Sequence, residues 1–154
     1  MLYRKFYDEL VKWYKQEKKL ALLIDGARQI GKTTLIRQFA KDYYGDNFVE
    51  INFINTPSAK EIFVGDLSVD GIISKLTLFL RRPLTPHKTL IFFDEVQECL
   101  EVRTAIKFLV DDGRFDYIES GSLLGINYKE IKSYAVGYEE NRTMYPMDFE
   151  EFAI

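Results

Sequence analysis

A glycine-bearing segment that ends in Lys-Thr is the stretch of this sequence with the clearest chemical meaning. It runs Gly26-Ala27-Arg28-Gln29-Ile30-Gly31-Lys32-Thr33, with Thr34 after it. The segment satisfies the pattern G-x-x-x-x-G-K-[ST] in full, in which the glycines let the backbone curl until successive N–H groups converge on a phosphate. Lys32 would add a positive charge for the β- and γ-phosphates, and the Thr33 hydroxyl would ligate Mg²⁺. The segment therefore predicts a phosphate-binding loop.

The sequence on either side of this segment separates a real phosphate loop from a glycine turn with an incidental lysine. Residues 20–24 before it form a continuous apolar run, which is typical of a strand buried on both faces of a parallel sheet. Apolar residues at helical spacing follow it from Thr34 to about Tyr44. A strand before and a helix after are the placement that the motif requires, and the helix would add the positive end of its dipole.

A pair of acidic residues, Asp94 and Glu95, follows the apolar run of residues 90–93. An acid at the end of a buried strand would lie beside the phosphate loop, where Asp94 could hold Mg²⁺ through its water shell. Glu95 would orient or deprotonate an attacking water. Such a pair taken alone is more typical of a solvated strand end. Together with the upstream loop, it indicates a second part of the same site.

A third polar element, Ser120-Gly121-Ser122, lies at the end of the fourth predicted strand. Ligands of a parallel sheet bind beyond the carboxyl ends of its strands. A hydroxyl at this position could therefore sense the γ-phosphate or the attacking water. A polar turn from strand to loop explains the same residues equally well, and both interpretations stay open.

Alternating strand and helix patterns surround these three elements. This alternation predicts a right-handed α/β fold with a parallel sheet. A stripe of aromatic and aliphatic residues predicts an amphipathic helix over residues 2–16, which we expect to pack on the sheet of its own domain; a partner-binding helix is the alternative. The strands are expected at residues 20–24, 48–54, 89–93, 115–120 and 142–145, and further helices at 34–44, near 72–80 and near 105–109.

Composition narrows the class of protein. The 154 residues suit a single domain, 1–154, and the formal net charge of −3 argues against a basic field over the whole domain for binding nucleic acid. One cysteine, Cys99, and one histidine, His87, cannot supply a disulfide framework, a zinc set or a Cys/His nucleophile pair. No apolar run approaches the roughly 20 residues that cross a bilayer. We therefore expect a cytoplasmic protein that does not bind membranes.

The end of the sequence carries a helix-start signal. Asp148 is followed three residues later by Glu151, as in a capping box. The helix that would begin here has only residues 148–154, so we expect it to be the start of a truncated helix.

Four stretches together closely resemble a bacterial and archaeal family of AAA-superfamily ATPases. They are GARQIGKTT at 26–34, IFFDEVQ at 91–97, SGSLL at 120–124 and YPMDFEEF at 145–152. The resemblance implies a P-loop NTPase of the ASCE type, with about five parallel strands in the order 5-1-4-3-2, flanked by helices. It also implies ATP and Mg²⁺ as ligands. Family members typically carry a C-terminal domain of poorly understood function. We expect this domain to be missing here, and we expect a homo-oligomer or a protein partner to form through it.

The resemblance also implies roles for individual residues. Lys32 and Thr33 would bind phosphate and Mg²⁺, Asp94 would be the Walker B acid, and Glu95 would be the catalytic glutamate. Ser122 would be the sensor rather than Ser120. Many members carry a Gly-Arg pair before the Tyr-Pro motif, whereas this sequence has Gly137-Tyr138. Arg142 lies nearby, although a surface arginine is the favoured interpretation. Family members also continue past residue 154 with a helical lid and a C-terminal domain, and we expect the loss of these parts to affect hydrolysis more than ATP binding.

Four functions compete for these motifs. An ATPase that uses ATP binding and hydrolysis as a conformational switch is the leading hypothesis. A small-molecule kinase fits less well, because Glu95 would activate the water that a kinase must exclude. A GTPase would normally show Asn-Lys-x-Asp, which does not occur. The main alternative is a nucleotide-responsive binding module with little hydrolysis, whose partner and biological task the sequence does not reveal. Nothing in this sequence supports a nucleic-acid role.

Overall fold

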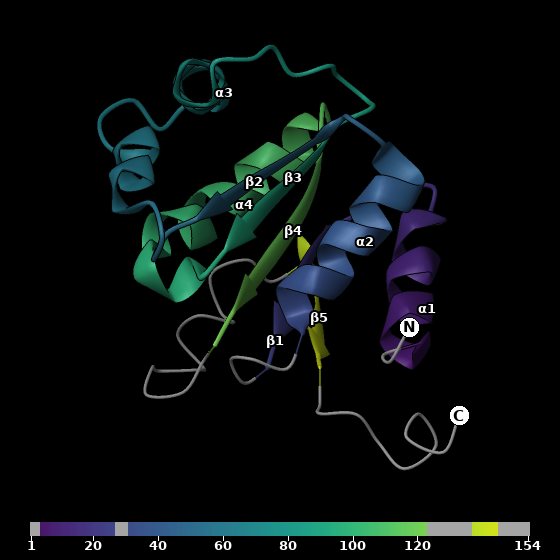
Figure 1. Ribbon diagram of the computed structural model, residues 1–154. Helices are drawn as coiled ribbons and strands as arrows, with labels where there is room; N and C mark the ends of the chain where they lie inside the picture. Colours follow the sequence, from purple (N-terminus) through teal and green to yellow (C-terminus); the bar gives the residue numbers. More distant parts are fainter. Residues whose placement is uncertain (1–3, 27–30, 123–136, 145–154) are drawn as a thin grey trace.

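A single parallel sheet forms the centre of the computed structural model, which describes residues 4–26, 31–122 and 137–144. Within these residues the strand order is β2-β3-β4-β1-β5 (Figure 1), and every neighbouring pair is parallel. The strands are β1 (Ala21–Asp25), β2 (Phe48–Asn52), β3 (Leu90–Asp94), β4 (Asp116–Gly121) and β5 (Glu139–Thr143). Both the α/β class and the order 5-1-4-3-2 are thereby confirmed.

Helices cover both faces of the sheet. They are α1 (Arg4–Tyr14), α2 (Lys32–Tyr44), α3 (Val69–Leu80) and α4 (Leu100–Asp112), with 3₁₀ turns η1 (Pro57–Phe63) and η2 (Val96–Glu98). In Figure 1, α1 and α2 lie on one face, and α3 and α4 on the other. Two buried clusters match this arrangement: Leu22, Ile24 and Phe92 pack with α1 and α2, whereas Leu23 and Phe93 pack with α3 and α4. The central strands β1 and β3 are buried along their whole length, as continuous apolar runs require.

Helix α1 is joined to the sheet through its apolar stripe. Leu10 and Trp13 are buried beside Leu22 and Phe39, and the Trp13 indole Nε1 donates a hydrogen bond to the Leu20 carbonyl at 2.8 Å. None of the helices within the described residues is long and apolar enough to cross a membrane.

Two strands differ by more than one residue from their expected bounds, and the other three are shifted by a single residue. The second strand ends at Asn52 rather than residue 54, because the Asn52 Oδ1 accepts hydrogen bonds from the backbone N–H groups of Ile54 and Asn55 at 2.9 and 3.0 Å and starts a turn. The fifth strand spans 139–143 rather than 142–145, since its backbone pairs with β1 from Ala21 onward. Tyr145 and the helix expected at 148–154 lie outside the described residues.

The polar strand β5 is held by a buried ion cluster. Arg103 on α4, Glu119 on β4 and Glu139 on β5 have side chains that are 0%, 0% and 1% exposed. The Arg103 guanidinium donates to Glu119 Oε1 at 2.6 Å and to Glu139 Oε1 at 2.7 Å, with a further bond from its Nη1 to Glu139 Oε2. The cluster joins α4 to β4 and to the edge strand β5. Separating these elements would leave a buried charge uncompensated, which is strongly unfavourable.

Two carboxylates share one arginine in this cluster, which makes stability depend on pH. Burial, followed by repulsion from Glu139, raises the pKa of Glu119 well above its usual value of 4.5. The folded chain therefore holds a proton that the unfolded chain releases, so stability falls as pH rises from about 4.5 through the raised pKa. Glutamine is neutral at all pH values and imitates the protonated form.

We predict that Glu119→Gln removes this part of the pH dependence. As the pH rises above about 4.5, the free energy of unfolding in urea would decline less in Glu119→Gln than in the wild type. Glu98→Gln, at an exposed position on η2, is the control and should follow the wild type. Parallel curves for Glu119→Gln and wild type would contradict the prediction.

Candidate nucleotide-binding site

The two ends of the glycine-bearing loop lie at the carboxyl end of β1 and at the start of α2. Gly26 follows β1 directly, and Gly31 immediately precedes α2 with φ 87°, a left-handed conformation that suits glycine. The site residues Ala27, Arg28, Gln29 and Ile30 lie outside the described residues. The first turn of α2 carries Lys32, Thr33 and Thr34, so the positive end of the helix dipole is available to a phosphate here.

Lys32 is positioned by backbone carbonyls from both sides. Its side chain is buried at 6% exposure, and its Nζ donates to the carbonyl oxygens of Gly26 and Gly121, both at 2.8 Å. Gly121 ends β4, which neighbours β1 in the sheet. The ammonium group is therefore fixed where the carboxyl ends of two adjacent strands meet, which is where ligands of parallel sheets bind.

Thr33 and Asp94 meet at the end of β3. The Thr33 hydroxyl donates to Asp94 Oδ2 at 2.9 Å, the Asn52 amide donates to the same oxygen at 3.4 Å, and the Glu95 N–H donates to Oδ1 at 2.9 Å. Burial is the main cause that raises the pKa of Asp94, and the Thr33 hydrogen bond partly opposes it. A bound cation would favour the ionised carboxylate, so this environment suits a metal ligand.

The donor atoms at this place fit Mg²⁺. Thr33 and Asp94 offer oxygen atoms, which hard cations prefer, and Mg²⁺ usually takes one or two carboxylates together with substrate phosphates. Among residues 4–26, 31–122 and 137–144, no group of three or more His, Cys, Asp or Glu side chains could hold a metal alone.

Glu95 has an unusual backbone conformation. Its φ is 60° and its ψ is 46°, and such a left-handed conformation of a residue other than glycine costs on the order of 1–3 kcal/mol. The Glu95 Oε2 accepts a hydrogen bond from Gln97 Nε2 at 2.7 Å. Backbone strain of this kind often occurs at functional sites, and here it lies between the end of β3 and the turn η2.

The serines at the end of β4 lie at the carboxyl ends of the strands, as Lys32 and Asp94 do. In the sheet register, Ser120 faces Asp94 on one side and Ile24 on the other, and Gly121 faces Asp25. Ser122 is buried at 6% exposure. The register therefore brings the ends of β1, β3 and β4 together, whereas the sensor role of Ser122 stays a prediction.

Arg142 is engaged elsewhere on the domain surface. Its guanidinium forms ion pairs with Glu9 at 3.5 Å and with Glu140 at 3.3 Å and donates to the Asn141 carbonyl at 2.9 Å. Its side chain is 41% exposed. These contacts join β5 to α1 and agree with a surface arginine.

Sequence reasoning gave no role to two residues that contact the acidic pair. Asn52 reaches Asp94 because β2 and β3 pair in a register that places these two residues opposite each other. Gln97 reaches Glu95 through the η2 turn. A polar residue that ends a predicted strand next to β3 could have signalled Asn52. For Gln97 the signals were its place two residues after the Asp-Glu pair and its inclusion in the stretch IFFDEVQ at 91–97.

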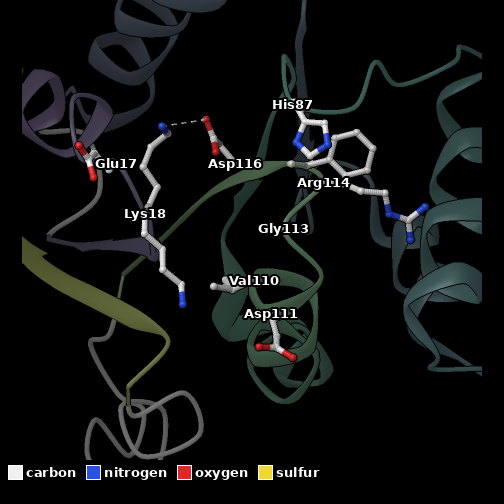
Figure 2. A pocket seen from close by; sticks show the side chains of 10 residues that line it. Glu17, Lys18, His87, Val110, Asp111, Gly113, Arg114 and Asp116 are labelled. Atoms are coloured by element: carbon white, nitrogen blue, oxygen red, sulfur yellow. Dashed lines mark ion pairs between the residues drawn. The ribbon is translucent and has the colours of Figure 1, made fainter.

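Two hollows lie at the other end of the sheet, near the amino ends of the strands. Their volumes are about 320 and 300 Å³, and both are lined by Lys19, His87 and Asp116, which lie at or just before the starts of strands. Figure 2 shows the larger one, whose lining includes His87, Arg114 and Asp116. Lys19 forms an ion pair with Asp116 at 3.9 Å. The hollows lie near the amino ends of the strands, whereas Asp94 ends β3 and Lys32 begins α2, so they are separate from the candidate site.

Comparisons with known proteins identify the family and the fold. The profile of a family described as an AAA domain matches residues 18–153. Comparison with curated proteins finds no match. Among solved structures, a chain in the structure of Drosophila ORC bound to AT-rich DNA and Cdc6 is similar, with a TM-score of 0.55 and 11% sequence identity. The match covers 99% of the present chain and 58% of that chain. At this identity, the similarity supports the fold alone.

Proposed function

Because the chain belongs to the AAA domain family, whose members are nucleotide-binding domains of the P-loop ATPase type, we propose that it binds Mg-ATP and hydrolyses it to ADP and phosphate. The observation that carries this proposal is the position of Lys32, whose buried ammonium lies between the carbonyls of Gly26 and Gly121. Carbonyl oxygens are only partial negative charges. A phosphate offers full charge and would draw the Lys32 Nζ from them.

The proposed binding mode uses the start of α2 and the end of β3. Backbone N–H groups of residues 26–34 would surround the β-phosphate, and Lys32 would contact the β- and γ-phosphates. Thr33 and Asp94 would hold Mg²⁺, which neutralises charge on the phosphate oxygens when bound. Thr33 Oγ1 and Asp94 Oδ2 already lie 2.9 Å apart, which supports this assignment.

The proposed chemistry assigns the proton to Glu95. Its carboxylate would accept a proton from a water whose oxygen bonds to the γ-phosphorus, while the bond from that phosphorus to the bridging oxygen of ADP breaks. Ser122 would contact the γ-phosphate or this water. The presence or loss of the γ-phosphate would then order or release the segments around Glu95 and Ser122, which is the basis of a conformational switch.

The position of Arg142 favours a second candidate, a nucleotide-responsive binding module with little hydrolysis. Arg142 is held by Glu9 and Glu140, and an arginine that stabilises the transition state contributes about 10³–10⁵-fold in related phosphoryl transfers. A second copy of the chain could supply the arginine that stabilises the transition state. Activity per molecule that rises with protein concentration would support a donated residue.

Phosphate release from Mg-ATP, measured across a wide range of protein concentration, tests the proposed hydrolysis. Release should saturate with ATP and disappear when EDTA removes Mg²⁺. A wild type that binds ATP yet releases no phosphate at any concentration would favour the binding module instead.

Asp94→Asn is expected to weaken binding of Mg-ATP by at least about tenfold, since one charged metal ligand is lost. Affinity for ATP in EDTA should change little, because phosphate contacts from the loop and Lys32 remain. Parallel titrations with a fluorescent ATP analogue, with and without Mg²⁺, would measure both. Equal losses in the two conditions would contradict a role for Asp94 at the metal.

A further inference from the structure

Gln97 connects the proposed catalytic carboxylate to the end of a neighbouring strand. Its Nε2 donates to Glu95 Oε2 at 2.7 Å. The other atom of its amide, Oε1, is buried and lacks a hydrogen-bond partner within the described residues. An acceptor buried in this way costs about 1–3 kcal/mol. Turning the amide over would bring Oε1 against the Glu95 carboxylate, so the bond to Glu95 determines the orientation of Gln97.

The buried Oε1 lies against Gly121 at the end of β4. A Cβ added to Gly121 would be only 2.3 Å from Gln97 Oε1, a distance that real Cβ contacts do not show. A side chain at position 121 would therefore force the Gln97 amide to move, because the other nearby atoms are 3.5 Å away. The amide of Gln97 fills the space that a side chain at position 121 would need.

Gly121 also contacts Lys32. Its carbonyl accepts the Lys32 Nζ hydrogen bond at 2.8 Å. A continuous series of contacts thus runs from Lys32 through Gly121 and Gln97 to Glu95. It joins the group that would bind phosphate to the group that would accept the proton of water.

We propose that Gln97 is a positioning residue for ATP hydrolysis, which holds the Glu95 carboxylate in place and uses Gly121 as its support. This inference rests on the proposed hydrolysis. Glu95 is only partly buried and its side chain has several rotatable bonds, so a charge-assisted hydrogen bond restricts where its oxygens lie. The role does not involve contact with ATP. Loss of Gln97 should therefore reduce kcat and leave ATP affinity unchanged.

Two single variants and their combination test the proposal. Gln97→Ala removes the amide, and Gly121→Ala places a methyl group where Oε1 now lies. Each should lower kcat for phosphate release by about tenfold, the effect of losing one charge-assisted hydrogen bond, with the Kd for ATP unchanged. The double variant should be no slower than either single variant, because both changes remove the same interaction. Gln38→Ala, on the exposed surface of α2, is the matched control and should retain wild-type kcat.

The outcomes separate this inference from the function on which it rests. A wild type that hydrolyses ATP, with Gln97→Ala equally fast or faster, overturns the positioning role and leaves the hydrolysis intact. Single effects that multiply in the double variant overturn the link through Gly121. A wild type without phosphate release overturns the proposed hydrolysis, and the role of Gln97 with it. Binding of a fluorescent ATP analogue by each variant verifies that the site still folds.

Discussion

Replacing Glu95 by glutamine is expected to lower the rate of phosphate release by about 10²–10⁴-fold, the usual contribution of a general base. Glutamine has the same shape but accepts no proton at neutral pH. The Gln97 amide can still donate to its carbonyl oxygen, so the local structure should persist. ATP binding should not weaken, because the contacts proposed for phosphate and Mg²⁺ come from Lys32, Thr33 and Asp94. Single-turnover phosphate release and an ATP titration of the same preparation measure the two properties.

Glu98→Gln is the matched control for this prediction. Glu98 lies three residues later on the same 3₁₀ turn and is exposed. Its substitution should leave phosphate release unchanged. Release by Glu95→Gln at the wild-type rate would show that another group accepts the proton.

Replacing Lys32 by alanine is expected to weaken ATP binding by about 10–100-fold, since a hydrogen bond to a charged group contributes about 1.5–3 kcal/mol. Phosphate release should be lost as well, because Lys32 is proposed to contact the γ-phosphate during transfer. Displacement of a fluorescent ATP analogue measures the affinity. Thermal unfolding should be recorded in parallel, since Lys32 also holds the carbonyls of Gly26 and Gly121.

Lys41→Ala provides the comparison for Lys32→Ala. Lys41 is exposed in the last turn of the same helix, so its loss changes the net charge equally without touching the loop. ATP affinity should match the wild type. If Lys32→Ala and Lys41→Ala bind ATP equally well, the phosphate site lies elsewhere.

The parts of the fold that sequence predicted well are those with a strong local pattern. The runs before Gly26 and Asp94 are apolar without interruption, and such runs belong to strands buried on both faces. These runs predicted the bounds of β1 and β3 to within one residue. They also showed that the phosphate loop follows one buried strand and that the Asp94-Glu95 pair follows another. The family resemblance supplied the strand order.

Strand β5 lacks such a pattern. Its sequence, EENRT, is entirely polar, and its position depends on backbone pairing with β1 and on the ion cluster with Arg103. No sequence pattern marks Arg103 and Glu119 as buried, because charged side chains are rarely buried unless paired. The two partners of Arg103, Glu119 and Glu139, are 16 and 36 residues away along the chain. No local stretch of sequence therefore contains the interaction.

The contacts inside the candidate site were hidden for the same reason. Asn52 and Asp94 meet only through the register of β2 and β3. The role of Gln97 depends on the close approach of Gly121, which is 24 residues later in the sequence. Sequence motifs therefore identified the residues expected to touch ATP, and the structure adds those that position them.

A calorimetric titration of the wild-type chain with ATP in excess Mg²⁺ tests the central claim most directly. The account predicts saturable binding of one nucleotide per chain, weakened strongly by Lys32→Ala and little by Lys41→Ala. Absence of saturable binding by a folded wild type, or equal affinity in the Lys32→Ala variant, would contradict a nucleotide site at the loop between β1 and α2.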